Sequence, residues 1–527
     1  MHYLLSYIFL FPLFIAFVLL FIPSEKWKFF RRLSLAVASV QLLLSSILLY
    51  HFDKELKPSS WETAFQFVER SDWINIGLGS ASNLRIEYHL GVDGISLPLV
   101  ALSSLVLLIG VISSWNIREK AKGYHILYLI LSASIVGCFI ALDFFLFYLC
   151  FEFMLLPMFF LIGIWGGKRR SYASIKFFLY TLFGSLFILI VMIGLYMSIE
   201  QGGVNSFSII AMLDGHYLKD SILNPAENGK IIGRSARALA FLFLLIGFGI
   251  KLPSIPIHTW LPDAHVEAPT PISVVLAGLL LKVGAYGLFR ILYGIFSDMT
   301  IKYAVWVALF GVLSILYGGL NALAQNDLKK MVAYSSVSHM GFVLVGLASL
   351  TSAGFSGSLF HMISHGIISP ALFLLAGVIY DRTHNRLIDN FSGLASKMPV
   401  YAFFTAIFFF AGLGLPGLSG FVGELTILMG AFSTALFGRW LAVLAVLGII
   451  ISAAYFLWAI QRMFFGPYFV RKSVWQDEMF DLTVRERIML IPLAIFVLIL
   501  GIFPSLILDY SNETIHFFLN YVSQFRP

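Results

Sequence analysis

The chain has 527 residues, of which 59% are hydrophobic and only 12% are charged, with a formal net charge of +7. Average soluble proteins carry roughly 25% charged residues, so this composition excludes an ordinary soluble domain. Although the net charge is positive, the sequence contains no basic stripe and no motif typical of nucleic-acid-binding proteins.

Hydrophobic runs long enough to cross a bilayer recur along the whole sequence, which indicates an all-α polytopic membrane protein. The first run lacks a basic flank and a small-residue cleavage site, so we interpret it as a retained helix and not as a signal peptide. Two longer polar connections, 52–90 and 200–237, interrupt the series. The predicted segments, about fourteen in number, are 3–22, 32–51, 91–115, 124–142, 144–164, 173–199, 238–261, 270–294, 302–323, 330–350, 354–380, 400–433, 440–465 and 487–510.

Lysine and arginine are distributed unequally between the two sides of this series. Most of the 35 basic residues lie on the side that the chain reaches after its first segment. The positive-inside rule therefore predicts that this side faces the cytoplasm and that both termini lie on the outer side.

The seventh and twelfth segments contain helix-breaking residues near their centres. Pro253 and Pro256 follow Lys251 in the seventh, and the run GLGLPGLSG precedes Glu424 in the twelfth. Because proline removes a helical donor and clashes with the preceding turn, we expect both helices to be discontinuous. Unwound backbone at membrane depth is tolerated where it is buried in protein or lines a hydrated cavity.

The two predicted breaks lie five segments apart, which favours two five-helix repeats of opposite orientation, each with one discontinuous helix. We therefore predict four regions. They are the N-terminal helices 1–3 with an external loop at 1–123, the first repeat (helices 4–8) at 124–294, the second repeat (helices 9–13) at 302–465, and a C-terminal region with helix 14 at 466–527.

Four ionisable residues lie near the centres of hydrophobic segments: Glu152, Lys251, Lys282 and Glu424. A charge at that depth costs about 2.5–3.5 kcal/mol on insertion scales, so such residues usually serve ion or proton transfer. A carboxylate beside a buried lysine favours the charged ammonium, whereas burial alone favours the neutral amine. We hypothesise that Glu152 and Lys251 form a switchable pair.

Three histidines lie between Lys282 and Glu424 in the sequence. His339 lies in the middle of a segment, and His361 and His365 share one helix face at a spacing of four residues. Imidazole titrates near neutral pH and passes protons between its two nitrogens, which favours a proton relay. The alternatives are a satisfied buried histidine, and a haem or metal ligand, although no matched histidine pattern supports haem.

A polar run, IHTWLPDAHVEAPTP, follows the first predicted break and contains His258, Asp263, His265 and Glu267. A short-spaced cluster of this kind can bind a metal. We interpret it instead as a proline-punctuated loop near the membrane interface that gives protons access to the segment.

Several motifs together resemble the antiporter-like proton channel family, whose members include subunits of the proton-translocating NADH:quinone oxidoreductases. The motifs are GFGIKLPSIPIHTWLPDAHVEAPTPISVVLAGLLLKVGAYGLFR, YHLGVDGISLPLV, LFYLCFEFMLLPMFF, NDLKKMVAYSSVSHMGF and GLPGLSGFVGE. The resemblance covers essentially the whole chain. This chain differs from the sister subunits L and N of the family, which have lysine at the position of Glu424.

The resemblance implies roles for individual residues. Glu152 and Lys251 are implied to be the essential pair, Lys282 the central channel lysine, and Glu424 the exit carboxylate. His339 and His365 are implied to belong to the connecting axis, and the resemblance assigns no role to His361.

The resemblance also implies a translocase subunit that couples proton transport to electron transfer from NADH to quinone. It implies no cofactor and no metal in this chain, with NADH, FMN, iron–sulfur clusters and quinone used elsewhere in the complex. Its implied partners are subunits L and N and other membrane-arm subunits, in the bacterial inner membrane. The rival interpretations are a subunit of a multisubunit sodium/proton antiporter, a membrane scaffold without transport activity, and a cytochrome-type electron carrier.

Overall fold

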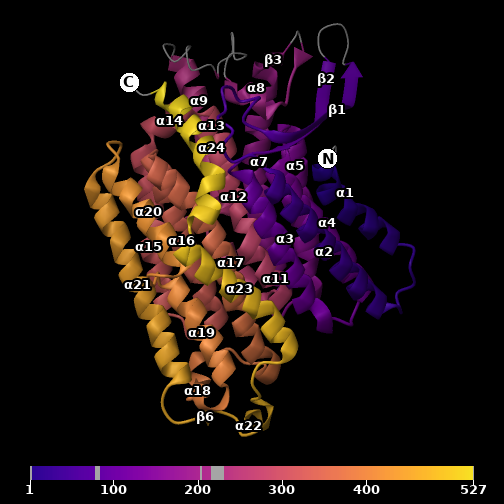
Figure 1. Ribbon diagram of the computed structural model, residues 1–527, viewed down its shortest axis with the longest axis vertical. Helices are drawn as coiled ribbons and strands as arrows, with labels where there is room; N and C mark the ends of the chain where they lie inside the picture. The colour runs from indigo at the N-terminus through magenta and orange to yellow at the C-terminus, as the bar shows by residue number, and fades with distance from the viewer. Residues whose placement is uncertain (1–2, 78–82, 202–203, 215–222, 224–230, 526–527) are drawn as a thin grey trace.

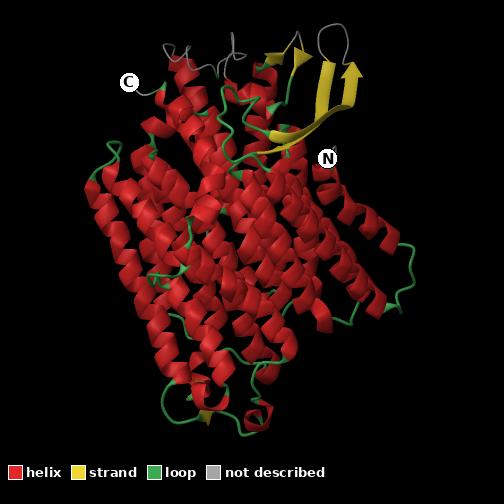
Figure 2. Ribbon diagram, viewed as in Figure 1, coloured by secondary structure: helices red, strands yellow, loops and turns green. Residues whose placement is uncertain are grey.

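The computed structural model describes residues 3–77, 83–201, 204–214, 223 and 231–525, so part of the predicted 200–237 connection lies outside the described residues. Helices form one large bundle, and short strands lie at its two ends (Figures 1 and 2). The polytopic helical architecture is confirmed.

Ten helices in the described ranges are long and apolar enough to cross a membrane, or eleven if a bent C-terminal pair counts as one span. Shorter apolar helices, Leu4–Leu19, Pro399–Gly412 and Ser419–Ser433, add to them. The number of spans predicted from the sequence, fourteen, stays a prediction.

The first part of the chain contains two helices, a β-hairpin and a third helix. They are α1 (Leu4–Leu19), α2 (Trp27–His51), β1 (Gln66–Gly77), β2 (Asn83–Val92) and α3 (Ser96–Ser113), followed by a 3₁₀ turn at Ser114–Asn116.

The region predicted as the first repeat continues into two short strands and ends in a series of short helical pieces. It contains α4 (Ala121–Ile140), α5 (Phe144–Phe153), α6 (Leu155–Trp165), α7 (Arg170–Ser198), β3 (Glu200–Gln201), β4 (Val204–Asn205), α8 (Ile209–Asp214), α9 (Ile231–Lys251), α10 (Trp260–Glu267), α11 (Thr270–Val275), α12 (Leu281–Gly287), α13 (Tyr293–Ile295) and α14 (Ser297–Lys302).

The remaining residues form longer helices that pack beside this region. They are α15 (Ala304–Leu323), α16 (Leu328–Ser349), α17 (Ser352–Thr383), a 3₁₀ turn (Ile388–Asn390), β5 (Phe391–Ser392), α18 (Leu394–Lys397), α19 (Pro399–Gly412), α20 (Ser419–Ser433), α21 (Arg439–Phe464), β6 (Phe469–Val470), α22 (Trp475–Glu478), α23 (Val484–Ile502) and α24 (Ser505–Ser523).

The hairpin of β1 and β2 was not predicted from the sequence, where 52–90 reads as a polar connection. The two strands pair antiparallel, from Gln66 opposite Val92 to Gly77 opposite Asn83. Glu87 on β2 binds Arg70 on β1 at 2.7 Å, so a cross-strand ion pair supports the hairpin, and it binds Arg85 on its own strand at 2.9 Å.

Both predicted helix breaks are present. Helix α9 ends at Lys251, and a non-helical segment containing Pro253 and the cis peptide Ile255–Pro256 separates it from α10. Helix α19 ends at Gly412, and the chain passes through Gly414 and Gly417, both at positive φ, before α20 begins. Glycine adopts that backbone conformation without the strain of a Cβ atom.

The C-terminal segment extends further than predicted. Helix α23 ends at Ile502, and α24 continues to Ser523 after a bend of 63°. The bend follows from Pro504, because proline pushes the residue before it, Phe503, out of the helical conformation.

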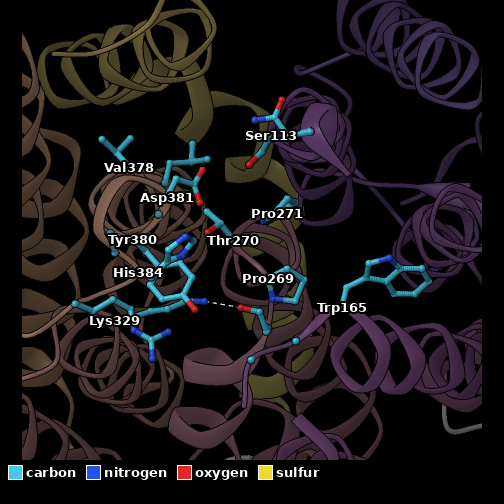
Figure 3. Close-up of a pocket in the computed structure, with 18 of the residues that line it drawn as sticks. Ser113, Trp165, Pro269, Thr270, Pro271, Lys329, Val378, Tyr380, Asp381 and His384 are labelled. Atoms are coloured by element: carbon cyan, nitrogen blue, oxygen red, sulfur yellow. Dashed lines mark hydrogen bonds between the residues drawn. The ribbon is translucent and has the colours of Figure 1, made fainter. Parts of the chain in front are cut away.

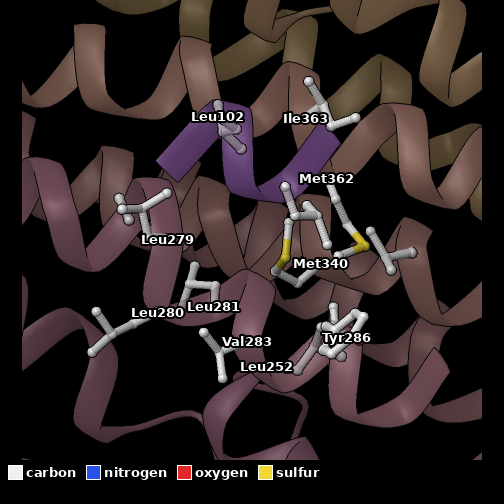
Figure 4. Close-up of a cluster of buried hydrophobic side chains, with 14 of the residues drawn as sticks. Leu102, Leu252, Leu279, Leu280, Leu281, Val283, Tyr286, Met340, Met362 and Ile363 are labelled. Carbon is white, nitrogen blue, oxygen red and sulfur yellow. The ribbon is translucent and has the colours of Figure 1, made fainter. Parts of the chain in front are cut away.

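The segment that carries Lys282 is not a regular α-helix. π-helical turns at Leu276–Leu280 and Leu288–Leu292 flank α12. Such turns are rare and occur often at functional sites. The surrounding side chains are apolar and buried, and Figure 4 shows several of them, including Met340 of α16 and Met362 of α17.

A fully buried ion pair ties this segment to the start of α3. Arg290 donates to Asp93 at 2.5 Å, and both side chains are almost completely inaccessible to solvent. The second oxygen of Asp93 accepts the backbone N–H groups of Ile95 and Ser96, which begin the helix. One carboxylate therefore both begins α3 and neutralises Arg290.

We predict that Asp93→Ala lowers the free energy of unfolding by about 3–5 kcal/mol, because Arg290 would remain charged and buried without a partner. The double variant Asp93→Leu with Arg290→Met should recover much of this loss. The measurement is thermal unfolding of the purified protein together with its abundance in membranes.

The matched control for this prediction is Asp72→Asn, which removes one of the two carboxylate partners of Arg85, the one in an exposed pair. It should change stability by at most about 1 kcal/mol. Equal losses for Asp93→Ala and Asp72→Asn would contradict the anchoring role of the buried pair.

Candidate functional site

Lys282 lies at the centre of the site and is completely buried. Its ammonium contacts the carbonyl oxygen of Ala277, in the preceding π-helical turn, at 2.7 Å and Nδ1 of His365 at 2.7 Å. The second ring nitrogen of His365 has no hydrogen-bond partner. A proton can therefore pass from the lysine to an imidazole that is free to hand it on.

A second group of ionisable side chains lies on the other side of His365. The ring of His339 is 5.6 Å from that of His365, centroid to centroid, and Nδ1 of His339 is 3.3 Å from a carboxylate oxygen of Glu424. His361 lies 5.4 Å from His339 on the same side. Helices α12, α16, α17 and α20 thus bring together Lys282, the three histidines and Glu424.

A small cavity separates the two groups. It is lined by His339, His361 and His365, with Ser335 and Ser369, and its volume of about 10 Å³ suits about one water molecule. Both ring nitrogens of His361 and both oxygens of Glu424 lack hydrogen-bond partners, so the polar groups that such a water requires are present.

The donor atoms of His339, His361 and Glu424 lie within 4.8 Å of one another, so these residues could hold a metal ion. Ligand atoms of a tetrahedral zinc site are roughly 3.4 Å apart, since each lies about 2.0–2.1 Å from the metal. The three side chains would therefore have to move closer together to bind one.

Lys251 and Glu152 occupy neighbouring positions without touching. The Lys251 ammonium donates to the carbonyl oxygen of Phe151 at 3.4 Å and lies 3.8 Å from the centre of the Phe151 ring. No ion pair joins the described residues Lys251 and Glu152, although Glu152 and Cys138 are both close enough to Lys251 to interact with it electrostatically. The switchable pair therefore stays a prediction, with Phe151 beside the lysine in this structure.

Glu152 itself is half-buried and faces the edge of the bundle. One of its oxygens is buried without a partner, and the hydroxyl of Tyr148, one turn earlier, interacts with it. Its helix α5 begins at Asp143, whose carboxylate accepts the backbone N–H of Leu146. Burial raises the pKa of Asp143 to about 7, against the opposing effect of the hydrogen bonds from the backbone N–H groups of Leu146 and Glu87.

A larger cavity of about 490 Å³ opens at the end of the bundle that carries most of the basic residues (Figure 3). Glu267, Asp381 and His384 line it together with Lys329. The Lys329 side chain is buried, and its ammonium donates to the carbonyl oxygen of Ala268 at 2.6 Å, the contact drawn as a dashed line. We call this cavity the vestibule.

His265 lies near both Lys329 and Lys282, a position that the sequence did not reveal. The predicted polar loop is in fact helix α10, and His265 on it is completely buried, stacked on Phe373 with ring centroids 4.3 Å apart. Neither ring nitrogen has a hydrogen-bond partner, and the ring interacts electrostatically with both Lys329 and Lys282. The LKK motif and the histidine are separated by more than sixty residues, so only the fold brings them together.

Taken together, these groups can pass protons but contain no feature of covalent or redox chemistry. Contacts order the central groups as Lys282, His365, His339 and Glu424, and His265 lies close enough to Lys329 and Lys282 to interact with both electrostatically. His258 lies apart from this series, with its ring near those of Tyr317 and Tyr334. Asp263 forms a surface ion pair with Lys176 at 2.7 Å.

Comparison with known proteins places this arrangement in a family. The family described as "NADH:quinone oxidoreductase/Mrp antiporter, TM" matches residues 141–452. The chain is 40% identical over 499 residues to a Rhodobacter capsulatus protein named NADH-quinone oxidoreductase subunit M, covering 94% of this chain and 91% of the relative. It is 40% identical over 509 residues to NAD(P)H-quinone oxidoreductase chain 4 1 of Synechococcus sp. (strain JA-3-3Ab), covering 95% and 90%.

Solved structures give the same result. A chain of respiratory complex I from Thermus thermophilus, determined with bound NADH, superposes with a TM-score of 0.80 and 28% identity over 99% of this chain and 100% of the other. A chain of the Mrp complex from Dietzia sp. DQ12-45-1b superposes with a TM-score of 0.79 over 99% of each chain. At 20% identity, the second match shows a shared fold alone.

We predict that Gly414→Ala disturbs proton transfer at Glu424. A Cβ atom at Gly414 would lie 2.6 Å from the Glu424 carboxylate, so the carboxylate must move away from His339. Proton conduction by the protein in vesicles should fall by about tenfold or more, since it depends on a positioned donor and acceptor.

The matched control is Gly417→Ala, because Gly417 also has positive φ but a Cβ atom there would meet nothing within 4 Å. Both variants should lose similar stability, roughly 1 kcal/mol, from backbone strain. If both lowered conduction equally, the effect would belong to the backbone turn and not to the position of Glu424.

Proposed function

Because the chain belongs to the NADH:quinone oxidoreductase/Mrp antiporter transmembrane family, we propose that its buried ionisable residues form a proton route through a redox-driven pump. The chain is a membrane-arm subunit of a proton-translocating NADH:quinone oxidoreductase and has no redox centre of its own. Electron transfer from NADH to quinone takes place in other subunits, which hold FMN and the iron–sulfur clusters. Energy must therefore reach this chain through contacts with its neighbours.

The observation that carries the route is the short series at the centre of the chain. Lys282 contacts His365 at 2.7 Å, His339 lies within 3.3 Å of Glu424, and a cavity of the size of a water molecule lies between the two groups. One water placed there would join them into a continuous series of proton donors and acceptors. We propose Lys282 as the central relay and Glu424 as the exit carboxylate.

We propose that Glu152 and Lys251 act as the switch that drives this relay. When the two pair, the lysine is charged and repels a proton on Lys282; when they separate, burial favours the neutral amine. The proposal is supported by the contact of Lys251 with Phe151 in place of Glu152, as expected of partners that can separate. Moving one charge against 100 mV requires about 2.3 kcal/mol, which one change at a buried ion pair can supply.

Proton uptake is assigned in this proposal to the vestibule. By the positive-inside rule, the excess of basic residues at that end supports a cytoplasmic vestibule, with the two termini on the outer side of the bacterial inner membrane. Lys329 and His265 then carry protons from the vestibule to Lys282. The two regions with discontinuous helices, 124–294 and 302–465, are proposed to be inverted repeats.

The proposed neighbours are the sister subunits L and N, one on each side of the chain. Glu152 lies beside an exposed apolar surface that includes Phe153 and Leu156. At the other side, near Glu424, a groove of about 640 Å³ between α20 and α21 is lined by Leu425, Met429 and Phe432. Surfaces of this kind, each adjacent to one end of the route, suit contacts that transmit a change from one subunit to the next.

The rival function is a subunit of a multisubunit sodium/proton antiporter, which shares the fold. A tagged chain should co-purify with a flavin- and iron–sulfur-containing arm, and proton uptake by its vesicles should require NADH. Purification without that arm, together with sodium-driven proton transport, would overturn the assignment to a redox-driven complex.

We predict that Lys251→Ala abolishes proton pumping by the intact complex, because the switch would lose its charge. Pumping and NADH oxidation are measured together in the same vesicles. Loss of both activities indicates tight coupling, and loss of pumping alone indicates a separable channel. Lys251→Arg keeps the charge but resists deprotonation. Normal pumping by this second variant would disprove the switch.

We also predict that Lys329→Met lowers proton pumping by about tenfold or more, most strongly at high cytoplasmic pH, where proton capture limits the rate. The adjacent Lys330→Met is the matched control, because the Asp327 side chain binds the backbone of both residues but only Lys329 contacts Ala268. Equal pH profiles for the two variants would exclude Lys329 from the uptake route.

A further inference from the structure

Three basic side chains lie over the ring of Trp27 where α2 begins, and one of them also lies over the ring of Trp115 beyond the end of α3. Trp115 is followed in the chain by Asn116 and Ile117, which line the vestibule. The guanidinium carbon of Arg31 lies 4.5 Å from the ring centre of Trp27 and 4.3 Å from that of Trp115. Arg118 lies 5.1 Å and Lys28 5.6 Å from the Trp27 ring. The Arg31 guanidinium is thus stacked between two indoles, which fix its plane.

The basic side chains of the cluster are not ion-paired within the part of the chain that the structure describes. Among the residues that the structure describes, Lys28, Arg31, Arg32 and Arg118 form no ion pair with a carboxylate. Arg31 makes one long hydrogen bond, 3.4 Å, to the carbonyl oxygen of Trp115, and its Nε is buried without a partner. Arg32 and Arg118 add repulsion from like charges. The guanidinium of Arg31 therefore has a fixed orientation and unused hydrogen-bond donors, and the positive charges of Arg32 and Arg118 lie near it.

This arrangement differs from a simple excess of basic residues on one side of a membrane. Topological lysines and arginines need only be exposed to water, and separate side chains serve that purpose. Holding several cations together costs energy through their mutual repulsion, and an anion at the centre of the cluster would offset it. The planar fork of arginine matches the oxygens of a phosphate in particular.

We propose that this cluster binds the phosphodiester headgroup of an anionic phospholipid. The apolar surface next to the cluster supports a lipid over a soluble phosphate, since Phe21 and Phe29 are exposed there. Tryptophan is favoured at the depth of the headgroups, with its ring at the boundary of the acyl chains. Basic clusters at the end of membrane helices bind acidic lipids in this way. The site uses none of the side chains to which proton transfer is assigned, and the proposal does not depend on the proposed proton route.

The test uses the intact complex, purified in detergent and titrated with dioleoylphosphatidylglycerol while bound lipid is counted by native mass spectrometry. A photoreactive phosphatidylglycerol should be recovered on peptides that contain Trp27 or Trp115. We expect Arg31→Gln and Arg118→Gln to weaken binding of this lipid by about tenfold or more, because each removes charge-assisted hydrogen bonds. NADH oxidation by these variants should stay at the wild-type rate, since neither residue touches the proton route.

The matched control is Lys472→Gln, which removes a basic side chain 5.3 Å from the ring of Trp475 at a site without the stacked pair of indoles. It should leave the affinity for phosphatidylglycerol unchanged. Arg118 is exposed, so its variant keeps the test valid if Arg31→Gln fails to assemble. Equal binding of zwitterionic phosphatidylethanolamine, or displacement by inorganic phosphate at equal concentration, would overturn the proposal. So would photolabelling that is unchanged by both arginine variants, or a carboxylate of a neighbouring subunit seated on Arg31.

Discussion

The position of Lys282 imposes the constraint on which the central part of the structure depends. An ammonium group in the middle of a bundle, with apolar side chains on every side, needs acceptors from the protein itself. A π-helical turn provides the carbonyl of Ala277, and α17 provides the ring of His365. Both contacts persist whether the lysine or the imidazole holds the proton, because one proton can occupy the hydrogen bond from either end. Irregular helix geometry and a buried histidine are thus two consequences of one buried amine.

The two helix breaks also need hydrogen-bond partners from within the protein, in this case for backbone groups. Backbone groups that leave a helix at membrane depth must be satisfied inside the protein. In the first break the indole of Trp260 donates to the carbonyl of Ile250, and the backbone of Ile255 donates to Ser314 on α15. The second break is enclosed against Glu424, which leaves no space for a Cβ atom at Gly414. Each break therefore lies next to one of the ionisable residues and fixes its position.

How much the sequence predicted depended on whether the signal was local. Hydropathy, Pro253, Pro256 and the glycine-rich run are local, and they gave the helical architecture and both breaks. The four buried charges were visible because an ionisable residue is conspicuous in an apolar run. The stacking of His265 on Phe373 and its closeness to Lys329 depend on three separate helices, so no spacing in the sequence encodes them. The hairpin was missed for a related reason: apolar and polar residues alternate only weakly in the polar connection 52–90, and the pairing of β1 with β2 appears only in the folded chain.

The two lysines of the route illustrate why distance, and not only charge, sets their roles. Lys282 has a proton acceptor in contact, whereas Lys251 contacts a carbonyl and an aromatic face that cannot accept a transferred proton. Lys251 is therefore suited to change its charge in place, under the influence of a carboxylate that approaches or retreats. Glu152 lies at the edge of the bundle, where a neighbouring subunit can move it, and Glu424 lies at the opposite end of the series, near another exposed surface. A movement of Glu152 caused by one neighbouring subunit can thus alter the proton affinity of Lys282. The resulting change at Glu424 can then act on a second neighbour, without any redox centre in the chain.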